Sequence, residues 1–184
     1  MDSAPLAHYL PDPSWFRHNP GGIHGVGHVS RVLWWAATIA DAIGMASAIR
    51  REALLWAAAV HDVGRVDDGS DHGHGRRSAQ WVTENLATYR PENASLDLGF
   101  IAELCAWHVV PDHLIERLSL ELVILKDADG LDRVRINDLD PSRLRLQHSA
   151  GLVEQARALE RATRQVGVNC GLDILRTAGR LASG

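Results

Sequence analysis

A histidine–aspartate pair, His61-Asp62, directly follows an uninterrupted run of eight apolar residues at 53–60. An imidazole and a carboxylate next to such a run are costly to bury unless something compensates their polarity and charge. A bound cation provides that compensation, and histidine and aspartate supply the nitrogen and oxygen ligands that divalent metal ions use. The pair therefore predicts a buried metal site at the end of an apolar segment.

Apolar residues elsewhere recur at the three- and four-residue spacing of amphipathic helices, and strand-type alternation is not sustained anywhere. The residues 1–26, rich in Pro and Gly, predict an irregular lead-in, and 67–75 predict a polar loop. Only 120–125 has a β-like pattern, and its length is ambiguous. A further short helical turn is expected after Gly130. We predict an all-α bundle of about seven helices, at 28–43, 48–61, 76–89, 96–108, 113–127, 149–166 and 170–181.

The composition fits one globular domain over residues 1–184, with 46% apolar residues and a net charge of −4. The acidic balance argues against a nucleic-acid polymer as a partner. The chain has no apolar run of the ~18–20 residues that a membrane span needs and no signal-peptide pattern, so we expect a cytoplasmic protein without a membrane partner. Cys105 and Cys170 are too few for a disulfide framework. The apolar faces of the last two helices are a candidate homodimer surface.

Side chains that ligate metals come from at least five separate predicted elements. Helical bundles build metal sites in this way, by converging several helices on one point in the core. Adjacent helical residues differ in direction by about 100°, so His61 and Asp62 serve one metal only near a helix end, where Gly64 is a suitable stop. The candidates in chain order are His24, His28, His61, Asp62, His74, His108, Asp127 and Asp129.

Three segments, in this order, resemble the H…HD…D signature of the HD-domain superfamily. The segments are His28-Val29-Ser30-Arg31-Val32, His61-Asp62-Val63-Gly64-Arg65 and Ala128-Asp129-Gly130-Leu131-Asp132. The resemblance covers roughly residues 24–133. It implies an all-helical, metal-dependent protein, which in most members is a phosphohydrolase. We accordingly divide the domain into the lead-in, a metal-binding core at 27–135 and C-terminal helices at 141–184.

The resemblance implies four primary metal ligands, which are His28, His61, Asp62 and Asp129. Asp127 competes with Asp129, but the family's usual Ala-Asp-Arg-Leu stretch aligns on 128–131 and favours Asp129. A subset of the superfamily has two further histidines and holds two metal ions, bridged by the aspartate of the HD pair. His74 and His108 resemble those two histidines, so one or two ions are expected.

A phosphorylated substrate needs positive charge beyond that of the metal. Arg65 follows the HD pair and is the first candidate for a phosphate contact. Arg76 and Arg77 stand at the start of a predicted helix, where side chains and backbone N–H groups together bind anions. Each of these arginines is a candidate substrate residue.

Gly130 stands where the family commonly has arginine, so we expect Arg133 or Lys126 to supply that positive charge. His24 precedes His28 by one helical turn. It is a candidate hydrogen-bond donor to the phosphate of the substrate, or a candidate proton shuttle. Trp15, in the lead-in, is a candidate to cover the pocket or stack on a base.

The resemblance and the residues together predict hydrolysis of a phosphoester, of a nucleotide or a similar small metabolite. A metal ion lowers the pKa of bound water from about 15.7 toward ~7. Asp62 is expected to orient the nucleophile or bridge two ions, and Arg65 or Lys126 to stabilise charge on the phosphoryl oxygens. His74 or His24 is expected to protonate the leaving group.

Mixed imidazole and carboxylate ligands suit Mn²⁺, Fe²⁺, Co²⁺ or Ni²⁺ at least as well as Zn²⁺. This leaves an HD-type di-iron oxygenase as the first alternative function. The second is a non-catalytic module that binds a metal or a nucleotide. Such a module usually lacks a key ligand, whereas this sequence has every ligand that the resemblance implies.

Overall fold

The computed structural model describes residues 4–44, 48–89, 96–165 and 171–183. These residues form helices and no β-strand, which confirms the predicted all-α class. They contain nine α-helices: α1 (Val26–Ala42), α2 (Ala48–Val60), α3 (His74–Trp81), α4 (Ala87–Tyr89), α5 (Leu98–Trp107), α6 (Leu120–Asp132), α7 (Gln147–Ala150), α8 (Val153–Gln165) and α9 (Gly171–Ala182). The predicted ends Val166 and Cys170 lie outside the described residues.

Short irregular helices connect the longer ones. The 3₁₀ segments are η1 (Ala4–Tyr9), η2 (Pro13–Trp15), η5 (Asp112–Leu114), η6 (Arg133–Ile136) and η7 (Pro141–Arg143), and η3 (Val82–Leu86) is a π-helix. The helix predicted at 76–89 is divided by this π-helix, and the one predicted at 149–166 is divided into α7 and α8. These divisions explain why about seven helices were predicted and nine are found among the described residues.

The helix predicted at 113–127 is wrong at both ends. The observed helix, α6, begins at Leu120, where the Ser119 hydroxyl accepts a 3.2 Å hydrogen bond from the Leu122 amide and caps the first turn. It continues through Gly130 to Asp132, so Asp129 lies within α6. The β-like residues 120–125 belong to this helix, since a short apolar run does not distinguish a buried helix from a buried strand.

The lead-in is more ordered than predicted, because η1 and η2 lie within it. The expectation that Trp15 covers a pocket or stacks on a base is wrong. Trp15 is only 5% exposed. Its ring centroid lies 5.1 Å from that of Trp81 and 5.4 Å from that of Tyr89. Trp15 therefore attaches the N-terminal segment to the core.

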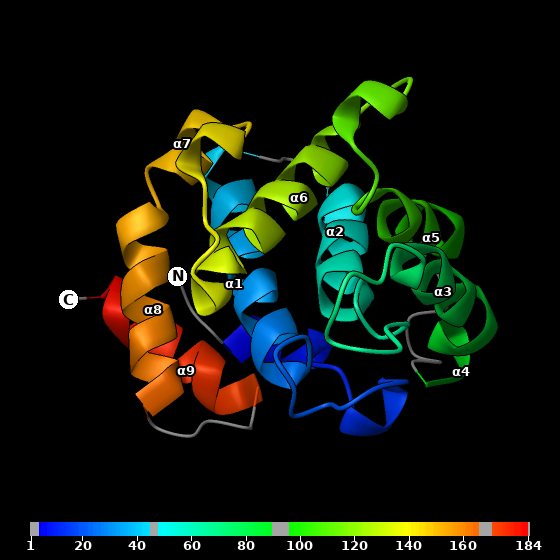
Figure 1. The fold of residues 1–184 in the computed structure, drawn as a ribbon, viewed down its shortest axis with the longest axis horizontal. Coiled ribbons are helices and arrows are strands. Elements are labelled where there is room, and N and C mark those ends of the chain that lie inside the picture. The colour runs from blue at the N-terminus through cyan, green and yellow to red at the C-terminus, as the bar shows by residue number, and fades with distance from the viewer. Residues whose placement is uncertain (1–3, 45–47, 90–95, 166–170, 184) are drawn as a thin grey trace.

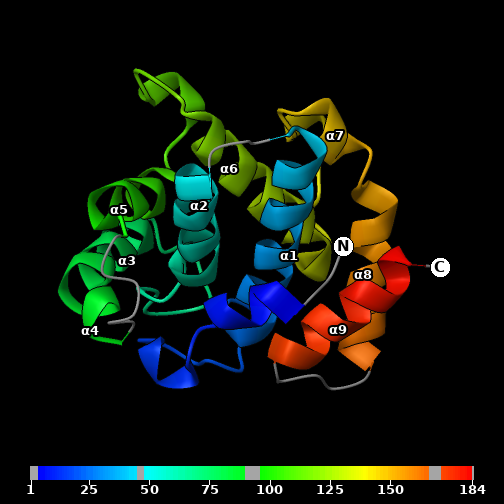
Figure 2. The same ribbon diagram turned by 180° about the vertical axis from the view of Figure 1, so that it is seen from behind.

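Helices α1, α2 and α6 form the middle of the bundle, with α3 and α5 on one side and α8 and α9 on the other (Figures 1 and 2). Helix α1 packs against α2, α6 and α9, and α5 packs against both α2 and α3. The side chains of Leu33, Ile39 and Ile124 on the central helices are fully buried, and so is that of Trp56, whose ring centroid lies 5.1 Å from that of Tyr9 in η1. Among the described helices, none is long and apolar enough to cross a membrane.

Two glycines allow α3 to approach its neighbours closely enough to complete the site. A Cβ on Gly64 would lie 2.5 Å from the backbone nitrogen of Ser78, so only glycine lets the end of α2 meet α3. A Cβ on Gly75 would lie 2.7 Å from the carbonyl oxygen of Cys105 in α5. Because Gly75 directly follows His74, this close approach places His74 beside the C-terminal end of α5.

Candidate metal centre

The predicted ligands come from five helices that meet at one end of the bundle. His28 lies in the first turn of α1, His61 and Asp62 directly follow α2, His74 begins α3, His108 follows the last residue of α5, and Asp129 lies in α6. All of these side chains except that of Asp129 are buried. The connection between α2 and α3, at 61–73, folds back so that His61, Asp62 and His74 share one centre.

The two carboxylate oxygens of Asp62 face two different pairs of histidines. Its Oδ2 lies 3.4 Å from the Nε2 of His28 and 4.0 Å from that of His61. Its Oδ1 lies 3.0 Å from the Nε2 of His74 and 3.8 Å from that of His108. The Oδ1 of Asp129 lies 3.4 Å from His28 Nε2 and so belongs to the first pair.

Each of the four imidazoles uses its Nδ1 to reach an oxygen that only accepts hydrogen bonds. The Nδ1 partners are the Asp132 carboxylate for His28 (2.8 Å) and carbonyl oxygens for the other three: Ala58 for His61 (2.9 Å), Asp71 for His74 (2.5 Å) and Cys105 for His108 (2.6 Å). The proton of a neutral ring therefore sits on Nδ1, and the lone pair sits on Nε2. Metal-bound histidines are held in this way.

The Nε2 atoms then face one another without a proton between them. They lie 3.2 Å apart in the His28–His61 pair and 3.0 Å apart in the His74–His108 pair. Two imidazole lone pairs at these distances repel, whereas a cation between them is ligated by both. The residues present therefore fit a metal centre, with Asp62 between the two histidine pairs.

The protonation states also fit ligation. Burial lowers the pKa of His61 to about 3, so its ring is neutral at neutral pH. Burial alone would raise the pKa of Asp62, but the surrounding side chains hold this pKa well below its usual value, so the carboxylate is ionised. A neutral imidazole next to an ionised carboxylate is the state that binds a divalent metal.

Asp129, and not Asp127, meets the histidines. The Asp127 carboxylate is buried away from them and accepts hydrogen bonds from the backbone N–H groups of Arg145 (2.9 and 3.0 Å) and Leu146 (2.9 Å). Among the described residues, three groups bring possible ligand atoms within 4.8 Å of one another: His28, His61 and Asp129; His61, Asp62 and His108; and His24, His28 and Asp62.

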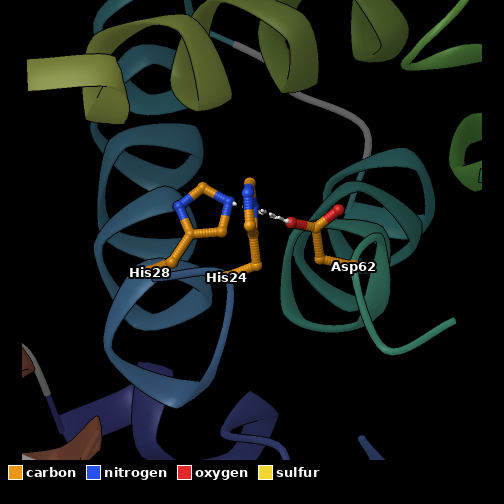
Figure 3. A group of neighbouring side chains, drawn as sticks. All are labelled: His24, His28 and Asp62. Carbon is orange, nitrogen blue, oxygen red and sulfur yellow. Dashed lines mark hydrogen bonds and ion pairs between the residues drawn. The ribbon is translucent and has the colours of Figure 1, made fainter. Parts of the chain in front are cut away.

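His24 extends the centre toward the outside. Its Nδ1 lies 3.0 Å from Asp62 Oδ2, and the side chains of His24, His28 and Asp62 point toward one another (Figure 3). The same Nδ1 lies 3.0 Å from an Nη2 donor of Arg135, whose Nε donates to the carbonyl of Ile23 at 2.7 Å. Arg135 was not predicted, because it reaches His24 only through the meeting of η6 with the lead-in.

Asp132 was also missed as a functional residue. It receives the His28 hydrogen bond and a second one, of 2.6 Å, from the Nε of Arg31. The three-residue spacing of His28 and Arg31 places both on one face of a helix, so a shared acidic partner was detectable in the pattern.

The centre opens into a cavity of about 1060 Å³. Of the predicted substrate and catalytic residues, six line it: His24, Asp62, Arg65, His74, Lys126 and Arg133. The Nε of Arg65 donates to Asp62 Oδ2 at 3.3 Å. Arg133 forms an ion pair with Asp138 near the surface of the protein. The cavity therefore combines the candidate metal ligands with positive charge.

The predicted phosphate contacts of Arg76 and Arg77 need correction, because neither side chain lines the cavity. Arg76 is exposed. Arg77 donates from Nε to the Gly64 carbonyl at 2.8 Å and from Nη2 to the Asp71 carboxylate. Arg77 thus holds the loop before α3 in place, and that structural role explains its position.

The fold and the centre together define a helical protein with a site for divalent metal ions. A model of the HD domain matches residues 25–134, which include every candidate ligand from His28 to Asp129. The chain belongs to the HD-domain family. His24 and Arg135 lie just outside the matched residues. No curated protein and no solved structure matches the chain.

Proposed function

We propose that this protein is a metal-dependent phosphohydrolase that acts on a small phosphoester, such as a nucleotide, and that its centre holds two divalent ions. The main support is the position of Asp62, whose two oxygens face two separate pairs of histidine Nε2 atoms. Mn²⁺, Fe²⁺, Co²⁺, Ni²⁺ and Zn²⁺ all suit these ligands. When bound, such ions supply Lewis acidity toward water and toward phosphoryl oxygens.

Arg65 is placed to bind the phosphoryl group of the substrate. Its side chain lines the cavity, and its Nε contact with Asp62 keeps the guanidinium beside the centre. Its Nη1 donates to the carbonyls of Asp67 (3.3 Å) and Gly69 (3.1 Å), which fix its orientation. A guanidinium fixed in this way stabilises the negative charge that develops on phosphoryl oxygens.

His24 is the better candidate for the proton donor to the leaving group. Both of its contacts, with Asp62 and with Arg135, use Nδ1, so Nε2 is the ring nitrogen available to hold and transfer a proton. His74 was the other predicted donor. Its Nδ1 is bonded to the Asp71 carbonyl and its Nε2 faces Asp62, so the proposal assigns it to the metal instead.

The test combines metal content with phosphate release. Elemental analysis of gently purified protein is expected to give two divalent ions per chain, and the loaded protein is expected to release phosphate from a panel of monoesters and diesters. Asp62→Ala is expected to abolish turnover while circular dichroism retains the helical spectrum. Asp173→Ala, which removes an exposed carboxylate on α9, is the matched control. Full turnover by the Asp62 variant would overturn the proposal.

The pair of His74 and His108 also supports a second candidate, an HD-type di-iron oxygenase. When this pair is included, the centre has six candidate ligands. A set of six such ligands suits two iron ions as well as it suits the two divalent ions of a hydrolase. Oxygen consumption by the iron-loaded protein, with no phosphate released from the ester panel, would favour this function. Bound metal with neither activity would favour the non-catalytic module.

A further inference from the structure

A second group of charged residues lies in the same cavity and contains none of the metal ligands. The carboxylate of Asp112 is held there by two cations. Its Oδ1 accepts hydrogen bonds from Lys126 Nζ at 2.8 Å and from Arg145 Nη2 at 3.0 Å, and its Oδ2 accepts one from Arg145 Nε at 2.7 Å. All three residues line the cavity. This two-point grip by a guanidinium is the geometry with which arginine binds carboxylate and phosphate groups.

Helix α6 positions both cations. Lys126 belongs to the helix, and its ammonium also donates to the carbonyl of Val110. Arg145 is fixed by the next residue of the helix, Asp127, whose buried carboxylate holds the backbone and the Nη1 of Arg145. The Asp127 carboxylate, which does not meet the histidines, thus places a guanidinium beside Lys126.

This pair of cations lies close to the metal centre along the helix. Lys126 precedes Asp129 by three residues, and residues at that spacing on a helix have Cβ atoms about 5–6 Å apart. The side chain of Lys126 is only 4% exposed. A buried ammonium next to a guanidinium favours an anionic neighbour strongly, because little water screens their charge.

Asp112 is the most replaceable member of this group. Its side chain is 36% exposed, and it lies in the three-residue segment η5. Turning it toward solvent would disrupt no α-helix. The hydrogen bonds from Arg145, and then that from Lys126, lower the pKa of the Asp112 carboxyl to about 2, so it is an anion at neutral pH. An incoming anion of the same charge and shape can therefore take its place.

We propose that Lys126 and Arg145 form a second anion subsite, occupied by Asp112 in this structure, and that the substrate carries a second anionic group that replaces Asp112. This inference rests on the proposed function, in which the metal centre holds the phosphoester that is cleaved. It assigns Lys126 to the second anionic group rather than to the reacting phosphate. The substrate class is a small molecule that carries two phosphates.

No tryptophan, tyrosine or phenylalanine is among the described residues that line the cavity. Base recognition by stacking on such a ring therefore has no residue to use there. A second phosphate, in contrast, meets two donors already aligned. The second anionic group of the substrate is therefore a phosphate. Whether a sugar or a nucleoside carries it is decided by comparing probes of both kinds.

The experiment compares two matched pairs of probes, ribose 5-phosphate with ribose 1,5-bisphosphate and adenosine 5′-monophosphate with adenosine 3′,5′-bisphosphate. The measured quantity is the ratio of kcat/KM for the bisphosphate to that for the monophosphate, since losses common to both cancel. Lys126→Met is expected to lower this ratio by roughly tenfold, and Asp112→Asn to raise it by a similar factor. Lys126→Arg keeps the charge and is expected to retain the ratio.

Asp173→Asn and Arg176→Met are matched controls, because this exposed pair on α9 does not line the cavity. Circular dichroism identifies any variant that fails to fold, and if Lys126→Met does so, Asp112→Asn carries the comparison. If the bisphosphate is preferred in the ribose pair, a sugar carries the second phosphate; if it is preferred in the adenosine pair, a nucleoside carries it. Hydrolysis with the same ratio in the wild type and in all Lys126 and Asp112 variants would overturn the subsite.

Calorimetric binding of the same probes to the metal-loaded protein separates this inference from the proposed function. Preferential binding of a bisphosphate that depends on Lys126 and Asp112, without hydrolysis, would support the subsite and contradict the phosphohydrolase. Equal binding of monophosphates and bisphosphates, or binding of neither, would overturn the subsite whatever the activity.

Discussion

The imidazole of His28 donates a 2.8 Å hydrogen bond to the carboxylate of Asp132, which lies 104 residues later in the sequence. This bond joins α1 to the end of α6 and fixes the proton of His28 on Nδ1. Burial would raise the pKa of Asp132, but the Arg31 guanidinium and His28 hold it well below its usual value. The orientation of one candidate ligand thus depends on a residue that does not face the metal.

Asp132→Asn is expected to weaken metal binding by roughly 10–100-fold, the usual effect of removing an outer partner of a ligating histidine. The amide cannot carry the charge that Arg31 and His28 require. Competition titration with a metal-chelating indicator measures the dissociation constant, and circular dichroism checks the fold. Asp173→Asn is the exposed control. Unchanged metal affinity in Asp132→Asn would show that His28 is oriented by other contacts.

Gly75→Ala is expected to separate α3 from α5 and reduce the metal content from two ions to one. The added Cβ would lie 2.7 Å from the Cys105 carbonyl oxygen and 3.1 Å from that of Ala106, and both belong to backbone that cannot move aside cheaply. Overpacking of this kind costs about 1–3 kcal/mol of unfolding free energy. Urea denaturation and elemental analysis measure the two effects.

Gly99→Ala is the matched control for this change. A Cβ on Gly99 would have an ordinary 3.6 Å contact with the Asp97 carboxylate, so helix propensity predicts a gain of about 0.5–1 kcal/mol. Equal effects of the two substitutions on stability and metal content would contradict the role of Gly75 in placing His74.

The ion pair of Asp71 and Arg77 is expected to stabilise the protein in a pH-dependent manner. Burial would raise the pKa of Asp71, but Arg77 and the backbone N–H groups of Val66 and Gly73 outweigh it and lower this pKa to about 2. A lowered folded-state pKa contributes stability above the unfolded value of about 3.9, and this contribution is lost as the pH falls toward 2.

Asp71→Asn therefore should lower the free energy of unfolding by on the order of 1–2 kcal/mol at pH 7. The difference from the wild type should shrink as the pH is lowered from 5 to 3, as measured by urea denaturation at each pH. Arg77→Met is expected to cause a similar loss, because it removes the same pair. A difference that stays constant down to pH 3 would contradict the assigned pKa.

Arg135→Met is expected to lower turnover by about 10²-fold, the usual contribution of a positioned proton donor, because it releases the contact on His24. Metal content should change less than turnover, since the Nη1 of Arg135 lies 3.5 Å from the Asp132 carboxylate, which keeps its shorter contacts with His28 and Arg31. Phosphate release and elemental analysis on the same sample separate the two effects. Arg135→Lys retains one donor and is expected to recover part of the activity. Loss of metal together with turnover would instead assign Arg135 a structural role.

The sequence determined the helical class and the set of candidate ligands. The helical spacing of apolar residues is repeated in many segments of the chain. The predicted helical class is therefore unaffected by an error at one helix end, such as that at Leu120. The order of His28, His61-Asp62 and Asp129 is likewise local information. Each of these segments can be compared with a family pattern without knowledge of how the helices pack.

The tertiary structure alone decided how the carboxylates and arginines divide their roles. Asp127 and Asp129 are two residues apart in α6 and point about 200° apart, and only the packing of the bundle decides that Asp129 faces the histidines while Asp127 faces the segment at 145–146. Arg77 and Arg135 have the same chemistry, yet one holds a loop and the other reaches His24. Such roles depend on distances between residues that are far apart in the sequence, and no local pattern encodes those distances.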